Sequence, residues 1–275
     1  MLNRARLARR RLLHADGRAF RQRRDGGDTV TRAADISCVF RIHLARVRRE
    51  AGPFLLAALV FPSAMYLFAV AVGGAEVAHD ESRLRLLAGS VVFSLSLTSI
   101  SWLGYLLLEN RFTGRLKLFA TLPLAPSSYV FGVLVFALAQ AALGTTTLLL
   151  VGRALGVPLR PNVALLVLVV VLTILCLCGL GVIIASRARS FSEGSLLTDT
   201  LGAGLVLLAP VYYAPEMMPR ALRVFAQLLP TTYAARAVQT TLAGGHDIGG
   251  ELLALGLMAV ATLALGFRLM KWRED

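Results

Sequence analysis

The residues with reactive side chains are few in this sequence, and they do not form a catalytic set. Cys176 and Cys178 make a CxC pair inside an apolar run, but no histidine or acid nearby could complete a metal site. We interpret both as buried thiols. The sequence contains no HExxH, no GxSxG and no pair of carboxylates within an apolar run. The four histidines are scattered outside the apolar runs: His14, His43, His79 and His246.

A few polar side chains do occur within the apolar runs. Asp199 is the one acid close to membrane depth. A carboxylate within the membrane is a functional candidate by default, whereas a carboxylate near the interface is solvated by water. Both interpretations of Asp199 stay open. Hydroxyl and amide groups gather in two runs, where they line a translocation path or, more commonly, bond neighbouring helices. These pathway candidates are Ser94, Thr98, Ser101, Gln140 and Thr145.

The sequence has no phosphate-binding loop of the Walker A type. GxxxxGK[ST] does not occur, and neither of the two lysines, Lys117 and Lys271, lies in a glycine-rich context. We therefore expect this chain to bind no ATP and to carry no cofactor of its own.

The positive charge of the chain is concentrated at its beginning. The 275 residues carry a net charge of +13 and a mean hydropathy of +0.68. Residues 1–50 hold 14 arginines against five acids, a net of +9, which leaves only +4 for the rest. The hydropathy excludes a soluble nucleic-acid-binding domain, so anionic lipid at the inner leaflet is a nearer partner than nucleic acid. Of the 29 basic residues 27 are arginine, a bias typical of a GC-rich bacterial genome.

Long apolar runs predict an all-α polytopic membrane protein with six transmembrane helices. Several of these runs exceed the roughly 18 residues that indicate a membrane span. The predicted spans are 53–72, 84–108, 129–151, 163–185, 196–213 and 252–270.

The distribution of Lys and Arg predicts that both termini are cytoplasmic. With that orientation the inner segments hold 22 basic residues and the outer segments hold seven. Most of the difference comes from the N-terminal tail. The chain is therefore expected in a bacterial inner membrane, as a multi-pass protein.

The first 50 residues divide into two parts. Residues 1–35, rich in Arg, Asp and Gly, lack periodicity and are expected to be a disordered cytoplasmic tail, while residues 36–275 form the permease domain. From Ile36 to Val47, apolar residues recur at helical spacing with arginines mostly on the other face. This pattern predicts an amphipathic helix along the inner leaflet, with a cytoplasmic extension of the first span as the alternative.

The loop at 109–132 predicts a cytoplasmic coupling helix between the second and third spans. Glu109, Asn110 and Arg111 end one apolar run, and leucines interleaved with basic residues follow before two prolines. A short amphipathic helix tied to a span at each end can transmit force and dock into a groove on a partner. An ordinary interfacial turn is the alternative. The other candidate coupling residues are Gly114, Arg115, Leu116, Lys117, Phe119 and Pro123.

Residues 214–250 are too apolar for a solvated loop, and their prolines divide them into pieces too short to span a bilayer. We therefore predict a re-entrant hairpin at the outer face, with helices at about 216–229 and 231–242 and a turn at Pro230. Such a hairpin could narrow or close an export path.

These two segments, in this order, resemble the membrane subunit of an ATP-binding-cassette (ABC) exporter of the type-2 permease family over about 36–273. The first signature of that family is matched by Glu109, Gly114, Leu116, Phe119 and Pro123. The second is matched by Pro210, Tyr212, Pro219, Leu222, Pro230 and Tyr233, although Leu229 stands where an Asn is usual.

The resemblance implies an export permease for an amphipathic drug, antibiotic, lipid or glycan, powered by a separate ATPase. Two copies of that ATPase, which bind ATP and Mg, and a second copy of this or a related permease would complete the complex. Two other classes remain as alternatives: an ion-coupled secondary transporter that needs no ATPase, and an intramembrane hydrolase.

Overall fold

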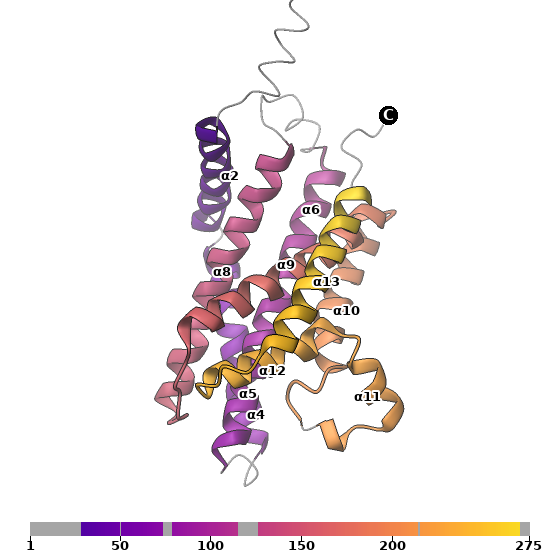
Figure 1. The fold of residues 1–275 in the computed structure, drawn as a ribbon. Helices are drawn as coiled ribbons and strands as arrows, with labels where there is room; N and C mark the ends of the chain where they lie inside the picture. The colour runs from indigo at the N-terminus through magenta and orange to yellow at the C-terminus, as the bar shows by residue number, and fades with distance from the viewer. Residues whose placement is uncertain (1–28, 50, 74–78, 115–125, 214, 270–275) are drawn as a thin grey trace, which may run out of the picture.

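The computed structural model describes residues 29–49, 51–73, 79–114, 126–213 and 215–269, and the described chain is helical with no strand (Figure 1). The first 28 residues of the predicted tail and residues 115–125 of the predicted coupling segment lie outside the described residues. The helices form one elongated bundle. Because the backbone hydrogen bonds of a helix, apart from those at its ends, are satisfied within the helix itself, this architecture suits an apolar surrounding.

Each predicted span coincides with a helix or a continuous helical run. The first span consists of three consecutive pieces: α3 (Ala51–Leu55), a π-helical stretch η1 (Leu56–Val60) and α4 (Phe61–Gly73). The second consists of α5 (Asp80–Ser96), a second π-helical stretch η3 (Leu97–Trp102) and α6 (Leu103–Phe112). The other four are single helices: α8 (Pro126–Ala154), α9 (Val163–Arg187), α10 (Phe191–Leu207) and α13 (Gly249–Leu269).

Four of these described helices are long and apolar enough to cross a membrane: 80–112, 128–154, 163–187 and 249–266. The other two are shorter. The apolar part of the first run covers Ala58–Gly73, and α10 has 17 residues, which at about 1.5 Å per residue is about 26 Å against about 30 Å of hydrocarbon. Four of the six predicted spans therefore match helices that could cross a membrane by their length and composition, and the six-span topology stays a prediction.

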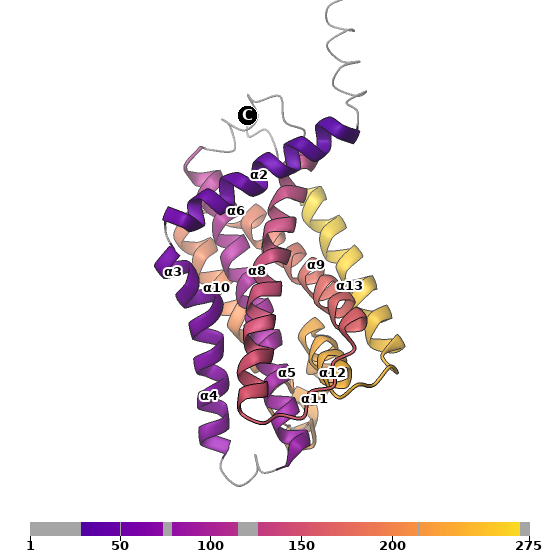
Figure 2. The same ribbon diagram turned by 90° about the vertical axis from the view of Figure 1, so that its left-hand side faces the viewer.

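The helix α2 (Thr29–Arg49) runs obliquely across one end of the bundle and not along it, over α8 and the end of α6 (Figure 2). It begins seven residues before the predicted Ile36. Its inward face is apolar, and Val39 is only 1% exposed. The approach to α8 is close because Gly132 faces Val39: a Cβ at Gly132 would lie 2.6 Å from the Cβ of Val39.

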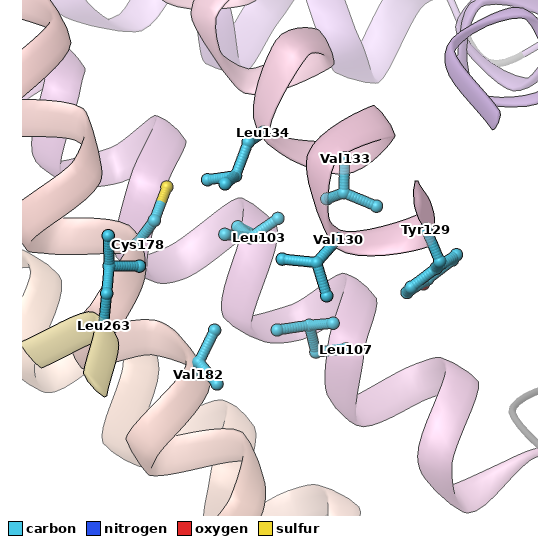
Figure 3. A pocket seen from close by; sticks show the side chains of 9 residues that line it. All are labelled: Leu103, Leu107, Tyr129, Val130, Val133, Leu134, Cys178, Val182 and Leu263. Atoms are coloured by element: carbon cyan, nitrogen blue, oxygen red, sulfur yellow. The ribbon is translucent and has the colours of Figure 1, made fainter. Parts of the chain in front are cut away.

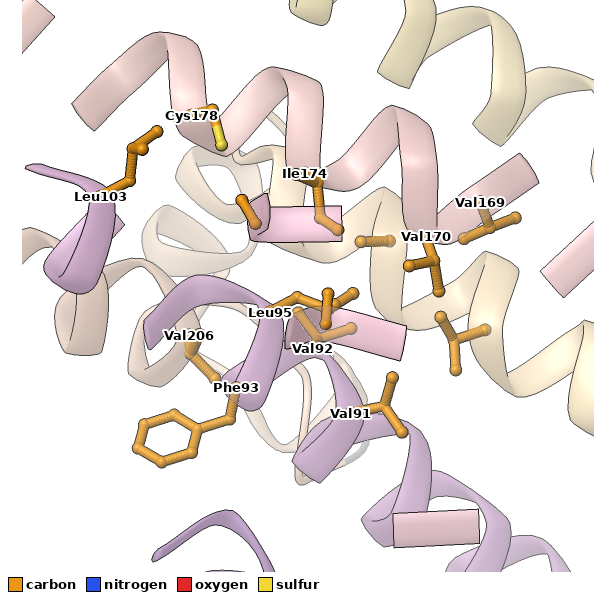
Figure 4. Close-up of a cluster of buried hydrophobic side chains, with 14 of the residues drawn as sticks. Val91, Val92, Phe93, Leu95, Leu103, Val169, Val170, Ile174, Cys178 and Val206 are labelled. Atoms are coloured by element: carbon orange, nitrogen blue, oxygen red, sulfur yellow. The ribbon is translucent and has the colours of Figure 1, made fainter. Parts of the chain in front are cut away.

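The core lies where α5, α9 and α10 meet, with α9 packed against α12 (Pro230–Leu242) and α13 as well. Val92 and Leu95 of α5, Ile174 of α9 and Val206 of α10 belong to one cluster of fully buried side chains (Figure 4). The second span is therefore the most enclosed of the bundle, and its outer neighbours shield it.

Residues 215–242 form three short elements instead of two. A 3₁₀ turn (η4, Pro215–Met217) and α11 (Arg220–Ala226) precede α12. The break at Pro230 is where the sequence predicts it, since a proline fits the first turn of a helix. The first predicted piece, 216–229, is shorter than expected, because Pro219 precedes α11 as its N-cap and the chain turns again at 227–229.

Candidate functional site

Three consecutive residues at the end of α6 contact three different neighbouring elements. A helix turns by about 100° per residue, so Glu109, Asn110 and Arg111 point in different directions. We call this set the α6 terminal triplet. Each member makes a polar contact with a partner distant in the sequence, and the triplet lies immediately before the predicted coupling helix.

Glu109 contacts α2. Its Oε2 lies 2.8 Å from Nη1 of Arg46, which donates a hydrogen bond as well as pairing its charge. The two side chains are 17% and 29% exposed, respectively, so the pair is largely shielded from water. Hydrogen bonds between ionised partners are stronger than neutral ones. The pair therefore fastens the crossing helix to the last turn of α6.

Asn110 contacts α8. Its Nδ2 donates to the hydroxyl oxygen of Tyr129 over 2.7 Å. Both residues are 3% exposed, so water cannot replace either partner. A buried polar group that loses its partner bears the full cost of desolvation, and this bond therefore holds the start of α8 against α6.

Arg111 contacts the end of α9. Its Nη1 donates to the carbonyl oxygens of Ala185 (2.9 Å), Ser186 (3.3 Å) and Ala188 (3.0 Å). The last carbonyls of a helix have no partner within it, and a cation there also favours the helix dipole. Arg111 thus closes the C-terminus of α9 at the turn that leads into α10.

The helix α6 ends directly after the triplet. The hydroxyl of Thr113 donates to the carbonyl of Glu109 over 2.6 Å, and Gly114 takes a φ of 73°. That positive φ suits glycine, which has no Cβ to clash. The remaining predicted coupling residues lie outside the described residues: Arg115, Leu116, Lys117, Phe119 and Pro123.

The pathway candidates are mostly buried and partly bonded to neighbouring helices. The hydroxyl of Ser101 donates to the carbonyl of Thr198 over 3.4 Å, and that of Ser96 donates to the carbonyl of Gly202 over 2.7 Å. These two bonds join the second span to α10. Ser94 and Thr98 are also buried, whereas Asp199 is exposed on α10.

Two pathway candidates on α8 have unsatisfied oxygens. Oε1 of Gln140 and Oγ1 of Thr145 are buried and lack a hydrogen-bond partner within the described chain. Because buried polar atoms are normally paired, these two oxygens mark α8 as a helix with unused hydrogen-bonding capacity.

The second set of predicted residues lies around the α11–α12 corner at the other end of the bundle. The hydroxyl of Tyr233 donates to the carbonyl of Gln227 over 2.8 Å, and that of Thr232 donates to the carbonyl of Ala226 over 2.6 Å. Pro230 between them is buried, Leu222 is half-buried and Pro219 is exposed. Tyr233 thus holds the corner closed.

Pro210 and Tyr212 lie in the segment that follows α10, away from Tyr233 along the chain. Both are half-buried, and the backbone there approaches α5 closely. A Cβ at Gly89 would lie 2.8 Å from the carbonyl oxygen of Val211 and 3.0 Å from Cδ1 of Tyr212. Only a glycine on α5 allows this contact.

A small apolar cavity lies beside Tyr129, the partner of Asn110. It measures about 20 Å³, lies among α6, α8, α9 and α13, and touches Tyr129 (Figure 3). That volume is close to the minimum for one water molecule, so in this arrangement the cavity has no room for a substrate. Within the described chain, no group of three or more His, Cys, Asp or Glu residues could hold a metal ion.

The sequence predicts the three residues as coupling candidates, but it does not predict the partners of the triplet. Arg46, Tyr129 and the Ala185 carbonyl are separated from it by 63, 19 and 74 positions. The sequence hints at these partners only through residue type and position. Arg46 lies on the predicted amphipathic helix, Tyr129 lies at the start of the third predicted span, and Ala185 lies at the end of the fourth.

The sequence matches the ABC-2 type transporter family over residues 36–243, about three quarters of the chain. The chain therefore belongs to this family, as its two signatures indicate, and it is a multi-pass membrane permease subunit of an ABC transporter. Permeases of this family typically work with an ATPase partner. No curated protein matches the sequence significantly.

Proposed function

We propose that this permease exports an amphipathic substrate, such as a drug, an antibiotic, a lipid or a glycan, across a bacterial inner membrane. Two copies of a separate cytoplasmic ATPase bind ATP and Mg and supply the energy. A second copy of this permease, or a related one, completes the path. This chain itself hydrolyses nothing.

The observation that carries the proposal is the α6 terminal triplet. A force applied to residues 110–122 reaches α6 first, because the segment continues directly from that helix. From there Glu109 passes it to α2, Asn110 to α8 and Arg111 to the junction of α9 and α10. A push at one place can thus move several spans together.

Such a push changes the transport state only if it favours one arrangement over the other. Docking of Leu116 and Phe119 in an ATPase groove supplies that difference when ATP draws the two ATPase subunits together. The spans then alternate between an inward-facing and an outward-facing arrangement.

We assign α4 and α10 as the two shorter spans of a six-span topology with both termini in the cytoplasm. The crossing helix α2 then lies at the inner leaflet. Its exposed arginines, Arg41, Arg48 and Arg49, would meet anionic lipid headgroups there. Its apolar inward face, represented by Val39, meets α8.

In this topology, α11 and α12 form the re-entrant hairpin that closes the outer end of the path. The surface of α11 and its flanks supports this role, because Met217, Val224 and Leu228 are 71%, 65% and 70% exposed. Large apolar side chains at such exposure face lipid or a partner subunit in preference to water. Asp199 and the hydroxyl groups of Ser94, Thr98 and Ser101 are the candidates for the path beneath the hairpin.

The deciding experiment uses the permease and its ATPase reconstituted together in proteoliposomes. Leu116→Glu or Phe119→Glu should abolish ATP-driven export while the permease still inserts and folds. Arg85→Glu is the control, since it places a new acid near the start of α5, at the opposite end of the second span from residues 110–122. Unchanged export by both coupling variants would overturn the proposal, and export driven by an ion gradient without ATPase would favour a secondary transporter.

A further inference from the structure

A large open groove lies between α8 and α9, in the half of the bundle away from α2. It encloses about 460 Å³, which is within the range of about 300–1,000 Å³ typical of ligand pockets. Its walls are mostly apolar, with Thr145 and Thr146 as the two residues that carry hydroxyl groups. They are formed by Leu138, Ala139, Ala142, Leu149, Leu166 and Val170, among others.

The groove opens to the outside of the bundle. The most apolar stretches of α8 and α9 are each only half buried, although the stretch on α9 is the most apolar of the four candidate spans. Val163 and Val167, which line the groove, are 65% and 56% exposed. In a multi-pass membrane protein this face meets the acyl chains of the bilayer.

The mouth of the groove carries positive charge. Arg160 directly precedes Pro161, which lines the groove, and Arg153 lies in the last turn of α8; both are exposed. No acid occurs from Arg153 to Val163. Asp247 is exposed next to His246 on the loop after α12, so the exposed charged residues of the segments at this end of the groove are two arginines and one acid.

The mouth is also held in place by hydrogen bonds. The backbone N–H of Arg160 donates to the carbonyl of Leu242 over 3.0 Å, and that of Asn162 to the carbonyl of Thr241 over 3.1 Å. The side chain of Asn162 lies 2.8 Å from Nδ1 of His246. Arg160 is thus carried by a backbone segment fixed to α12.

We propose that this groove binds one acyl chain of an anionic phospholipid, with the lipid phosphate beside Arg160. An apolar channel with a cation at its mouth matches the two parts of such a lipid, because guanidinium groups bind phosphate well. The site is distinct from the α6 terminal triplet and does not depend on the transport function proposed above.

A second copy of the chain fits the groove less well. In a two-fold symmetric contact the same patch meets itself. Arg153 and Arg160 of one copy would then approach the same arginines of the other, and like charges in a contact of low dielectric repel. A lipid phosphate instead neutralises them.

The test is native mass spectrometry of the full-length detergent-purified chain, titrated with palmitoyl-oleoyl phosphatidylglycerol or phosphatidylcholine. Ala142→Trp places a large ring in the groove, whereas Ala261→Trp, at an exposed alanine of α13, is the matched control. The wild type and Ala261→Trp should retain one phosphatidylglycerol that Ala142→Trp does not. Arg160→Glu should reduce the preference for phosphatidylglycerol over phosphatidylcholine by about fivefold or more, since one arginine near a lipid surface contributes about 1 kcal/mol.

Equal lipid retention by Ala142→Trp and the wild type would overturn the inference. A loss of dimer instead of lipid in Ala142→Trp would overturn it in favour of a contact between copies. If the tryptophan variant does not fold, Arg160→Glu decides: its side chain is exposed and its backbone bonds remain, so an unchanged lipid preference contradicts the inference.

Discussion

Nη1 of Arg46 lies 2.8 Å from Oε2 of Glu109, and this ion pair joins a helix that crosses the bundle to a helix that runs through it. The two residues are 63 positions apart. Because α2 also contacts α8 through Val39, the pair is the second point at which α2 is fastened. A helix held at two points on different helices resists their relative movement, so α2 acts as a brace on the end of the bundle where coupling is proposed.

Reversing one charge of this pair should weaken the brace, and reversing both should restore it. Arg46→Glu leaves two carboxylates facing each other, and Glu109→Arg leaves two guanidinium groups. The single variants should lose about 1 kcal/mol of stability and most ATP-driven export, because the side chains are only partly exposed. Thermal unfolding in detergent and export by the reconstituted complex measure both effects.

The Arg85–Glu81 pair provides the matched control for this charge reversal. Its atoms lie 3.0 Å apart within one helix, and the Glu81 side chain is 76% exposed. The same reversals there should change neither stability nor export appreciably, since exposed pairs contribute little. Strictly additive effects of Arg46→Glu and Glu109→Arg in the double variant would contradict a direct interaction.

Removing the hydroxyl of Tyr129 should destabilise the bundle markedly, although only one oxygen atom is lost. In Tyr129→Phe the Nδ2 of Asn110 loses its acceptor at a place that water does not reach. The expected cost is about 1–3 kcal/mol in the free energy of unfolding. Denaturant titration of the purified permease measures it, with Tyr105→Phe as the control because Tyr105 on α6 is 41% exposed.

A second variant distinguishes a lost hydrogen bond from lost packing. Asn110→Leu combined with Tyr129→Phe removes both polar partners, so the double variant should be less destabilised than the sum of the single variants. A cost of Tyr129→Phe no larger than that of Tyr105→Phe would show that the Asn110 bond contributes nothing to stability.

The positions of the helices could be predicted from the sequence because apolar runs and prolines act locally. Every predicted span contains a helix, and the break at Pro230 was predicted at the right residue. Lengths were less predictable: α10 ends at Leu207 and not at Tyr213, because the chain turns before Pro210. The sequence does not predict that α11 begins only after Pro219, because a segment with several prolines does not show which of them precedes a helix.

The partners within the site could not be predicted, because they depend on how helices cross. Glu109, Asn110 and Arg111 are recognisable as a polar end to an apolar run. Which helix each one meets is set by the rotation and tilt of α6 against its neighbours, and a run that is apolar on all sides carries little information on rotation. The close approach of α2 to α8 likewise depends on Gly132, one of 24 glycines in the chain.

Enlarging Gly132 should detach α2 from α8. A Cβ at this position would lie 2.6 Å from the Cβ of Val39 and 3.2 Å from the carbonyl oxygen of Ile36, so Gly132→Leu forces the two helices apart. Overpacking of this kind costs about 1–3 kcal/mol. We expect tryptic cleavage after Arg46 to require release of α2, so it should become about 5- to 150-fold faster.

Gly204→Leu is the control for this overpacking, because no atom lies within 4 Å of a Cβ built at Gly204. Cleavage after Arg46 should proceed at the wild-type rate in that variant. Equal cleavage rates in Gly132→Leu and the wild type would mean that α2 does not depend on this contact.

Acid should weaken the docking of α2 through His43. This residue is 7% exposed, and its ring centroid lies 5.5 Å from that of Phe136. Burial, with a smaller contribution from Arg46, lowers the pKa of His43 from 6.5 to about 4. Between those two pH values His43 binds a proton when α2 is released but stays neutral when α2 is docked. The stability of the docked state is therefore fully present above pH 6.5, and it decreases as the pH falls towards 4.

The loss should reach about 3 kcal/mol at most, at about 1.4 kcal/mol per pH unit. The thermal unfolding midpoint of the purified permease, compared between pH 7.5 and pH 5, measures it. His43→Phe keeps a ring against Phe136 but cannot bind a proton, so its midpoint should fall less over this range than that of the wild type. His79→Gln, at an exposed histidine before α5, should keep the wild-type dependence, and an equally steep fall in His43→Phe would assign the acid sensitivity to another group.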